Sequence, residues 1–215
     1  RSTLSSSSAA SDVYKRQVLE TTFETVDGKA RVLDCFSMHP GGREEPHRQI
    51  LRVVEGIEGE MEMALHVEPR FDYGLLGPWL RNYGERSLVA LGGHQGLLLS
   101  SDFDLRQVKD ECCACTATVR EGERLRLSIL HREPHILDGE DVEVPSSGDL
   151  DERLEQTIRW WRRWSNSGRY DGPHKTKVLR SATVLKGLSN APTGAISAAA
   201  TTSLPEVIGG ERNWD

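Results

Sequence analysis

The sequence predicts a mainly β chain that becomes α-helical toward its C-terminus: a partial antiparallel β-sandwich over residues 18–145, followed by helices. Within residues 18–144, several short runs alternate apolar and polar side chains, as strands with one buried face do. Turn signals join most of these runs as hairpins, which favours an antiparallel arrangement. After Pro145 the apolar residues recur every three or four positions, which is the period of a helix.

Three segments are predicted to be hairpins, because a turn-forming pair containing glycine separates two β-like runs in each. The segments are residues 18–36 around Asp27-Gly28, residues 86–102 around Gly92-Gly93, and residues 113–133 around Glu121-Gly122. Two separate strands are predicted between the first two hairpins, over residues 49–56 and 59–71. In the second of them the apolar residues occupy one face: Met61, Met63, Leu65 and Val67.

Residues 146–172 are predicted to be a linker helix. Residues spaced by four, four, three and four positions form one stripe along this helix: Leu150, Leu154, Ile158, Trp161 and Ser165. Trp160 and Trp164 broaden the stripe. Asp149 followed by Glu152 has the form of a capping box at its start. A stripe this rich in tryptophan is most simply a packing face.

A second helix is predicted to begin near Pro173 and to end before the Pro192 and Gly194 of "NAPTG". Its apolar residues are Val178, Leu179, Ala182, Leu185 and Leu188.

The composition is that of a soluble globular chain. Of 215 residues, 37% are hydrophobic and 28% are charged, and no apolar run is long enough to cross a bilayer. The formal net charge of −6 argues against nucleic-acid binding, which normally needs a basic surface. We interpret the cluster of Arg159, Arg162 and Arg163 as a solvated helix face. We therefore expect neither a nucleic-acid nor a membrane partner.

The four cysteines are Cys35, Cys112, Cys113 and Cys115. A thiolate metal site completed by a histidine is one interpretation, but the spacing lacks the C-x₂₋₄-C pattern of structural zinc sites. In a strand, Cys113 and Cys115 would share one face and Cys112 would point the other way, so buried free thiols are the simpler interpretation. We expect no metal and no cofactor, and a reducing, cytoplasmic location.

Residues 1–17 differ from everything that follows. This serine-rich segment lacks the apolar central region of a secretory signal. It back-translates to bases that resemble the transposase adapter of short-read sequencing libraries; a disordered polar tail is the plainer alternative. We expect residues 1–17 to be adapter-derived and disordered, and the natural sequence to be cut at Val18.

The C-terminal segment carries the functional signal. The motifs "APTGAI" (191–196), "TTSLPE" (201–206) and "GGERNWD" (209–215) closely resemble the loop after the first barrel helix of glycoside hydrolase family 15, which includes bacterial glucoamylases and trehalases. The stretches "VLETTFETVDGKARVLDCF", "RVVEGIEGEMEM", "RFDYG" and "WWRRWSNSGRY" also resemble this family, so the resemblance covers residues 18–215. Ala200 departs from an expected proline, which costs some loop rigidity.

The resemblance implies that residues 173–215 begin a six-fold α/α barrel, cut after Asp215, whose full form hydrolyses terminal α-glucosidic bonds with inversion. Both catalytic glutamates of the family would lie beyond Asp215, so we assign no catalytic residue here and expect the fragment itself to be inactive. The implied substrate is an oligo- or disaccharide of α-linked glucose.

The implied substrate-binding residues are Arg212, Trp214 and Asp215. An indole offers a flat apolar face to a sugar ring, and charged groups bind hydroxyls through charge-assisted hydrogen bonds. The structural alternative is that Trp214 only packs and that Arg212 pairs with Glu206 or Asp215.

Two questions remain open at this level. The rival function is a stand-alone β-sandwich that serves as a carbohydrate-binding or interaction module. The aromatic loop formed by residues 70–74 and 77–79 would either contact carbohydrate or, more simply, contact the barrel. Neither the choice between trehalose and maltodextrin nor the oligomeric state follows from the sequence.

Overall fold

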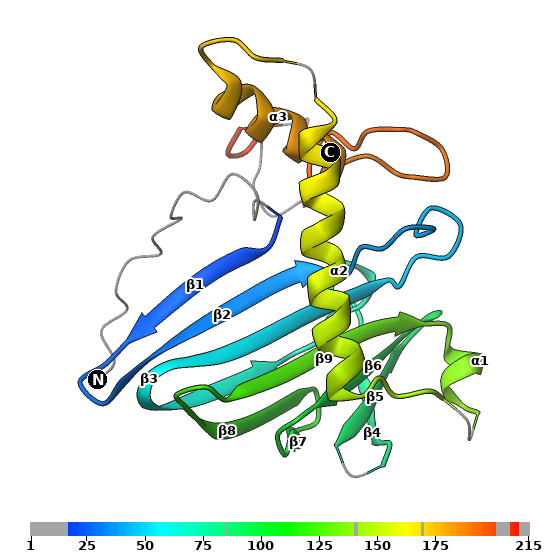
Figure 1. Ribbon diagram of the computed structural model, residues 1–215. Coiled ribbons are helices and arrows are strands. Elements are labelled where there is room, and N and C mark those ends of the chain that lie inside the picture. The colour runs from blue at the N-terminus through cyan, green and yellow to red at the C-terminus, as the bar shows by residue number, and fades with distance from the viewer. Residues whose placement is uncertain (1–16, 85, 140–141, 169, 201–206, 211–215) are drawn as a thin grey trace.

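The computed structural model describes residues 17–84, 86–139, 142–168, 170–200 and 207–210 (Figure 1). As predicted, it is mostly antiparallel β-sheet followed by helices. The prediction for the N-terminal segment falls outside the described residues except at Gln17, whose side-chain amide donates to the Thr183 carbonyl at 3.2 Å. None of the described helices is both long and apolar enough to cross a membrane.

The strands are β1 (Leu19–Glu24), β2 (Gly28–Phe36), β3 (Gln49–Val67), β4 (Trp79–Asn82), β5 (Ser87–Gly92), β6 (Gln95–Ser101), β7 (Arg106–Lys109), β8 (Cys112–Arg120) and β9 (Arg124–Arg132). The helices are α1 (Pro134–Leu137), α2 (Ser147–Asn166) and α3 (Lys175–Gly187), with a short 3₁₀ turn at Asp72–Gly74.

These strands form two sheets that share β3. The first has the order β1-β2-β3-β9-β6-β5-β4, and the second is β3-β8-β7. The first half of β3 pairs with β2 and β9, and its second half pairs with β8. Apolar side chains of both sheets pack together between them; for example, Val32 and Val54 of the first sheet share a cluster with Met61 and Val119 of the second. The structure is thus mostly antiparallel sheet, in two layers joined through β3, which is consistent with the predicted sandwich.

The structure corrects the prediction of two separate strands over residues 49–56 and 59–71, because β3 runs unbroken for 19 residues. It changes sheet between Gly56 and Gly59. Gly59 has φ +60°, a conformation that side-chain-bearing residues rarely adopt. A methyl group on Gly56 would overlap the carbonyl oxygen of Arg120. These two glycines therefore permit the bend within a single strand.

The predicted hairpin over residues 113–133 is also wrong, although its turn is correctly placed at Glu121-Gly122. Strands β8 and β9 lie in different sheets, and each pairs with β3. Their connection is held against the bend by three backbone hydrogen bonds: Gly56 N–H to Glu123 O (3.0 Å), Glu121 N–H to Gly59 O (2.9 Å) and Gly122 N–H to Gly56 O (3.0 Å). The other two predicted hairpins, β1–β2 and β5–β6, are confirmed.

The cysteines take the positions that the alternation predicts. Cys113 is fully buried, and Cys115 packs against the same inter-sheet cluster from the same face of β8. All four cysteines are free thiols. Cys35 lies on the other face of the first sheet, beneath α2, and burial is the main cause that raises the pKa of its thiol to about 12.

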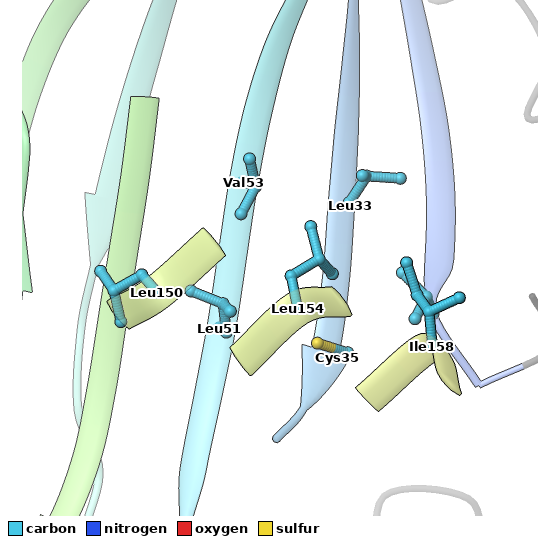
Figure 2. Close-up of a cluster of buried hydrophobic side chains, with 8 residues drawn as sticks. Leu33, Cys35, Leu51, Val53, Leu150, Leu154 and Ile158 are labelled. Carbon is cyan, nitrogen blue, oxygen red and sulfur yellow. The ribbon is translucent and has the colours of Figure 1, made fainter. Parts of the chain in front are cut away.

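Helix α2 covers the outer face of the first sheet, as Figure 2 shows. Its buried residues are Leu150, Leu154, Thr157, Ile158 and Trp161, which confirms the predicted stripe up to the tryptophan. They face a patch formed by Leu33, Cys35, Leu51 and Val53. The N-cap is Ser146 rather than Asp149. Ser146 accepts from the Asp149 backbone, and the Asp149 side chain accepts from the Ser146 N–H in return, so Asp149 is the second partner of the capping box.

We expect Gly56→Ala to destabilise the protein by about 2 kcal/mol or more, because the added methyl group meets rigid backbone. The control is Gly148→Ala in the first turn of α2. There the nearest atom to a new methyl group is Ser146 Oγ at 3.8 Å, so a gain of up to about 1 kcal/mol is expected. Urea unfolding followed by tryptophan fluorescence measures both. Equal effects at the two positions would show that the bend does not need a glycine.

Candidate functional site

The predicted substrate-binding residues Arg212, Trp214 and Asp215 lie outside the described residues, as does Glu206. What the structure describes is the segment that leads to them: α3, residues 188–200, and the turn at 207–210.

Helix α3 is attached to the sandwich through few contacts. It begins at Lys175, close to the predicted start, and ends at Gly187, before "NAPTG" as expected. The ammonium group of Lys186 lies 5.8 Å from the ring centre of Trp160 in α2, which is within cation–π range. Thr183 is its one residue described as buried, in contrast to the five of α2. The tryptophan-rich end of α2 thus joins sandwich and helix.

The loop after α3 is closed by an asparagine. The Asn190 side-chain oxygen accepts from the backbone N–H (3.2 Å) and the hydroxyl (3.0 Å) of Thr193, while the Asn190 N–H donates to the Ala195 carbonyl at 2.7 Å. Gly194 has φ +73°, so glycine suits this turn. The "APTGAI" motif therefore has a defined local shape.

Apolar side chains of this C-terminal region face outward. Leu185 is 52% exposed and Ile196 is 57% exposed, and Val178 and Ile208 are also exposed. A helix whose apolar side is open in this way is not packed like α2. The six-fold barrel predicted for residues 173–215 is not visible in the described residues, which show a single helix and the loop that follows it.

A cavity of about 200 Å³ lies between the two sheets. Its walls are mainly apolar, with one ion pair in which Arg52 donates to both carboxylate oxygens of Asp34 at 2.7 and 3.0 Å. Cys115 also lines it, but burial raises the pKa of this thiol, so it is a poor nucleophile. This cavity offers room for a small apolar group and no catalytic pair among its described walls.

A second hollow, of about 640 Å³, lies beside the β5–β6 turn and is lined by Gly93, His94, Gln95, His131, Glu133, Pro134 and His135. Despite its histidines, the described part of the chain holds no group of three or more His, Cys, Asp or Glu residues placed to bind a metal ion.

The aromatic loop predicted as a contact surface projects from the sandwich. Phe71 is buried and anchors it, whereas Tyr73 is 93% exposed and Trp79 is 58% exposed. Asp72 and Tyr73 have φ of 48° and 53°, which is unusual for residues with side chains. Arg70 holds the loop through an ion pair with Glu111 at 2.8 Å.

The charged groups over the outer face of the first sheet form a continuous network. Buried Glu55 pairs with Arg31 and with Arg124 (2.6 Å), Arg124 reaches Asp151 of α2 (3.5 Å), and Asp151 binds Arg126 at 2.6 Å. This network fastens the start of α2 to β2, β3 and β9.

The shifted carboxyl groups are stabilised in their charged form. Hydrogen bonding by Arg126 is the main cause that lowers the pKa of Asp151. The pKa values of Asp104, Asp149 and Asp171 are also lowered, chiefly by hydrogen bonds from Arg106, Ser146 and Lys175. A general acid needs a raised pKa instead, so none of these four carboxylates fits that role.

The curated proteins to which the chain is similar are named as trehalases. The chain is 33% identical over 92% of its length to "Trehalase" of Mycobacterium tuberculosis, of which it covers 31%. It is 30% identical over 78% of its length to "Trehalase" of Thermoplasma volcanium, covering 26% of that protein. It is 28% identical over 92% of its length to "Trehalase 1" of Sulfolobus acidocaldarius, covering 31%. The chain thus spans about a third of the length of the curated relatives it matches.

Other comparisons add little. No protein-family profile matches the chain. A solved structure of a "Putative kojibiose phosphorylase from human microbiome" aligns with 80% of this chain and 23% of its own, at 10% identity and a TM-score of 0.36.

We expect Asp151→Asn to flatten the acid dependence of stability. Because the folded-state pKa of Asp151 is lowered, its contribution is present above the unfolded value of about 3.9 and is lost as the pH falls through the folded pKa. The free energy of unfolding by urea, measured between about pH 6 and pH 3, should therefore fall less steeply in the variant. Exposed Asp110→Asn serves as the control and should follow the unmodified chain; a parallel loss in all three proteins would contradict the assignment.

Proposed function

We propose that this chain is part of a family 15 glycoside hydrolase that hydrolyses terminal α-glucosidic bonds, with trehalose as substrate. The observation that carries the proposal is the sequence similarity to proteins named trehalase over 92% of the chain. The motifs over residues 191–215, which resemble the family's first barrel loop, support it independently of overall identity.

In this proposal the chain divides into three parts with different roles. Residues 18–145 form a non-catalytic sandwich, residues 146–172 are the linker helix, and residues 173–215 begin the α/α barrel. The exposed apolar side of α3 supports this division, because such a surface is stable only when further helices cover it.

The reaction would proceed with inversion, using two carboxyl groups roughly 6.5–9.5 Å apart. One protonates the glycosidic oxygen, and the other removes a proton from the water that attacks the anomeric carbon from the opposite side. We place both glutamates in the part of the parent protein beyond Asp215, so the chain alone would not catalyse the reaction.

The proposed roles of the site residues follow from their chemistry. Trp214 would stack on the glucose ring in the subsite next to the scissile bond, while Arg212 and Asp215 would bind its hydroxyls. The turn at Val207–Gly210, closed by a 2.9 Å hydrogen bond from the Gly210 N–H to the Val207 carbonyl, immediately precedes them.

The comparisons give no support to the rival function, a stand-alone carbohydrate-binding or interaction module, because the relatives reported above are all named as trehalases. A reducing, cytoplasmic location remains part of the proposal and is supported by the four free thiols.

The test begins with the parent reading frame, recovered by sequencing outward from this segment in the source DNA. The parent protein should release glucose from trehalose faster than from maltose or maltodextrin. Early in the reaction, inversion at one anomeric carbon of this α,α-linked disaccharide gives equal amounts of α- and β-glucose, which proton NMR distinguishes. Release of α-glucose alone would indicate a retaining mechanism. If the parent protein released no glucose from any α-glucoside, the proposed function would be wrong.

Asp215→Asn in the parent protein should lower kcat/KM for trehalose by about 10- to 100-fold, because a hydrogen bond to a charged group is worth about 1.5–3 kcal/mol. The matched control, Asp27→Asn in the exposed turn between β1 and β2, should leave kcat/KM within about twofold. If both variants behave alike, Asp215 does not contact the substrate.

A further inference from the structure

Basic side chains with no carboxylate partner among the described residues gather between α2 and the neighbouring ends of β3 and β9. We define the basic cluster as His47, Arg132 and Arg153, with Arg48 and His39 at its rim. Arg132 ends β9, Arg153 lies on α2, and His47 belongs to the loop that leads into β3. This loop emerges beside α2 in Figure 1.

The partners of these groups are neutral acceptors. Arg132 donates from Nη1 to the backbone carbonyls of His131 at 3.0 Å and His47 at 3.4 Å. Arg153 donates to the side-chain oxygen of buried Gln49 at 3.0 Å. The ring of His47 stacks on His39, with centres 4.0 Å apart, and its Nδ1 is buried without a hydrogen-bond partner among the described residues.

The rest of the same sheet face provides the contrast. There Arg31, Arg124 and Arg126 all pair with carboxylates of Glu55, Asp102 or Asp151. No described carboxylate lies within ion-pair distance of Arg132 or Arg153. Among the described residues, the arginines at one end of this face thus pair with acids, whereas Arg132 and Arg153 at the other end bond to neutral oxygens.

Burial and the closeness of these basic groups to one another lower two pKa values in the cluster. Burial, and then repulsion from Arg153 and Arg48, lowers the pKa of Arg132; Glu143, the one acid that opposes this, has the smallest effect. Burial, followed by repulsion from Arg153, His39 and Arg132, lowers the pKa of His47 to about 4. His47 is therefore neutral at pH 7, and the two guanidinium groups repel each other. Positive charge collects here although the formal net charge of the chain is −6.

We propose that the basic cluster is a binding site for an oxyanion, either a carboxylate or a phosphate group. Such a group would accept hydrogen bonds from both guanidinium groups and neutralise their repulsion. It would also give the buried Nδ1 of His47 a partner, and its negative charge would favour the protonated imidazole. A phosphate would come from a small molecule, whereas a carboxylate could also belong to another segment of the longer parent protein.

The test is an NMR titration of the histidine ring signals of the ¹⁵N-labelled chain near pH 6.5. Inorganic phosphate and sodium acetate are added separately, with sodium chloride keeping the ionic strength constant. We expect saturable shifts of the His47 signals. Saturation by phosphate alone would identify a phosphate-type site, and saturation by acetate as well would identify a site that accepts carboxylates. If neither anion saturates the signals, or if chloride reproduces the shifts, the site does not exist.

Two variants locate the binding. Arg132→Gln should weaken the affinity by about tenfold or more, because charge-assisted hydrogen bonds are lost. The variant should keep its fold, since the contacts of Arg132 are to two backbone carbonyls. Arg162→Gln, on the exposed side of α2, is the matched control and should change the affinity by less than about twofold. Equal weakening in both would mean that the anion responds to overall charge, which would overturn the proposal. Circular dichroism confirms that each variant is folded.

Discussion

The bend of β3 between Gly56 and Gly59 is the constraint on which the rest of the structure depends. This one strand supplies an edge to β2, to β9 and to β8, so it fixes the register of both sheets and the distance between them. The bend is possible because the backbone of the β8–β9 connection approaches Gly56 more closely than any side chain would allow. This close approach determines how the two sheets pack against each other. It thereby also sets the position of the outer face that α2 covers.

On that outer face, α2 combines two kinds of contact. Its leucine and isoleucine side chains pack against the apolar patch, while Asp151 forms ion pairs within the network that links β2, β3 and β9. The apolar contacts stabilise the helix in proportion to the area they bury but are non-directional, whereas the ion pairs have a defined geometry and fix its direction and register. Toward the end of the same helix, Trp160 contacts Lys186 of α3. Helix α2 therefore links the sandwich to α3 and so to the segment that precedes the proposed substrate-binding residues.

Much of the fold could be predicted from alternation, turn pairs and the helical stripe, since each of these reports a local preference. The β8–β9 connection could not, because alternation indicates which face of a strand is buried but not which sheet the strand joins. Ser146 was missed as the N-cap because Asp149 offered an equally good cap in sequence. His47, Arg132 and Arg153 are too far apart in the chain for any motif to connect them. The proposed sugar-binding residues came only from a family resemblance, and they lie outside the described part of the chain.

The sharing of β3 also has a consequence for synthesis on the ribosome. After β1 and β2 have emerged, β3 can pair with β2 at once, but its remaining edges await β8 and β9, whose first residues are Cys112 and Arg124. For that interval the nascent chain displays open strand edges and half of an apolar interior, a state prone to wrong pairing with neighbouring chains. The short connection at Glu121–Glu123 shortens the last part of this exposure, since the two missing strands leave the ribosome nearly together and close both layers around the same strand.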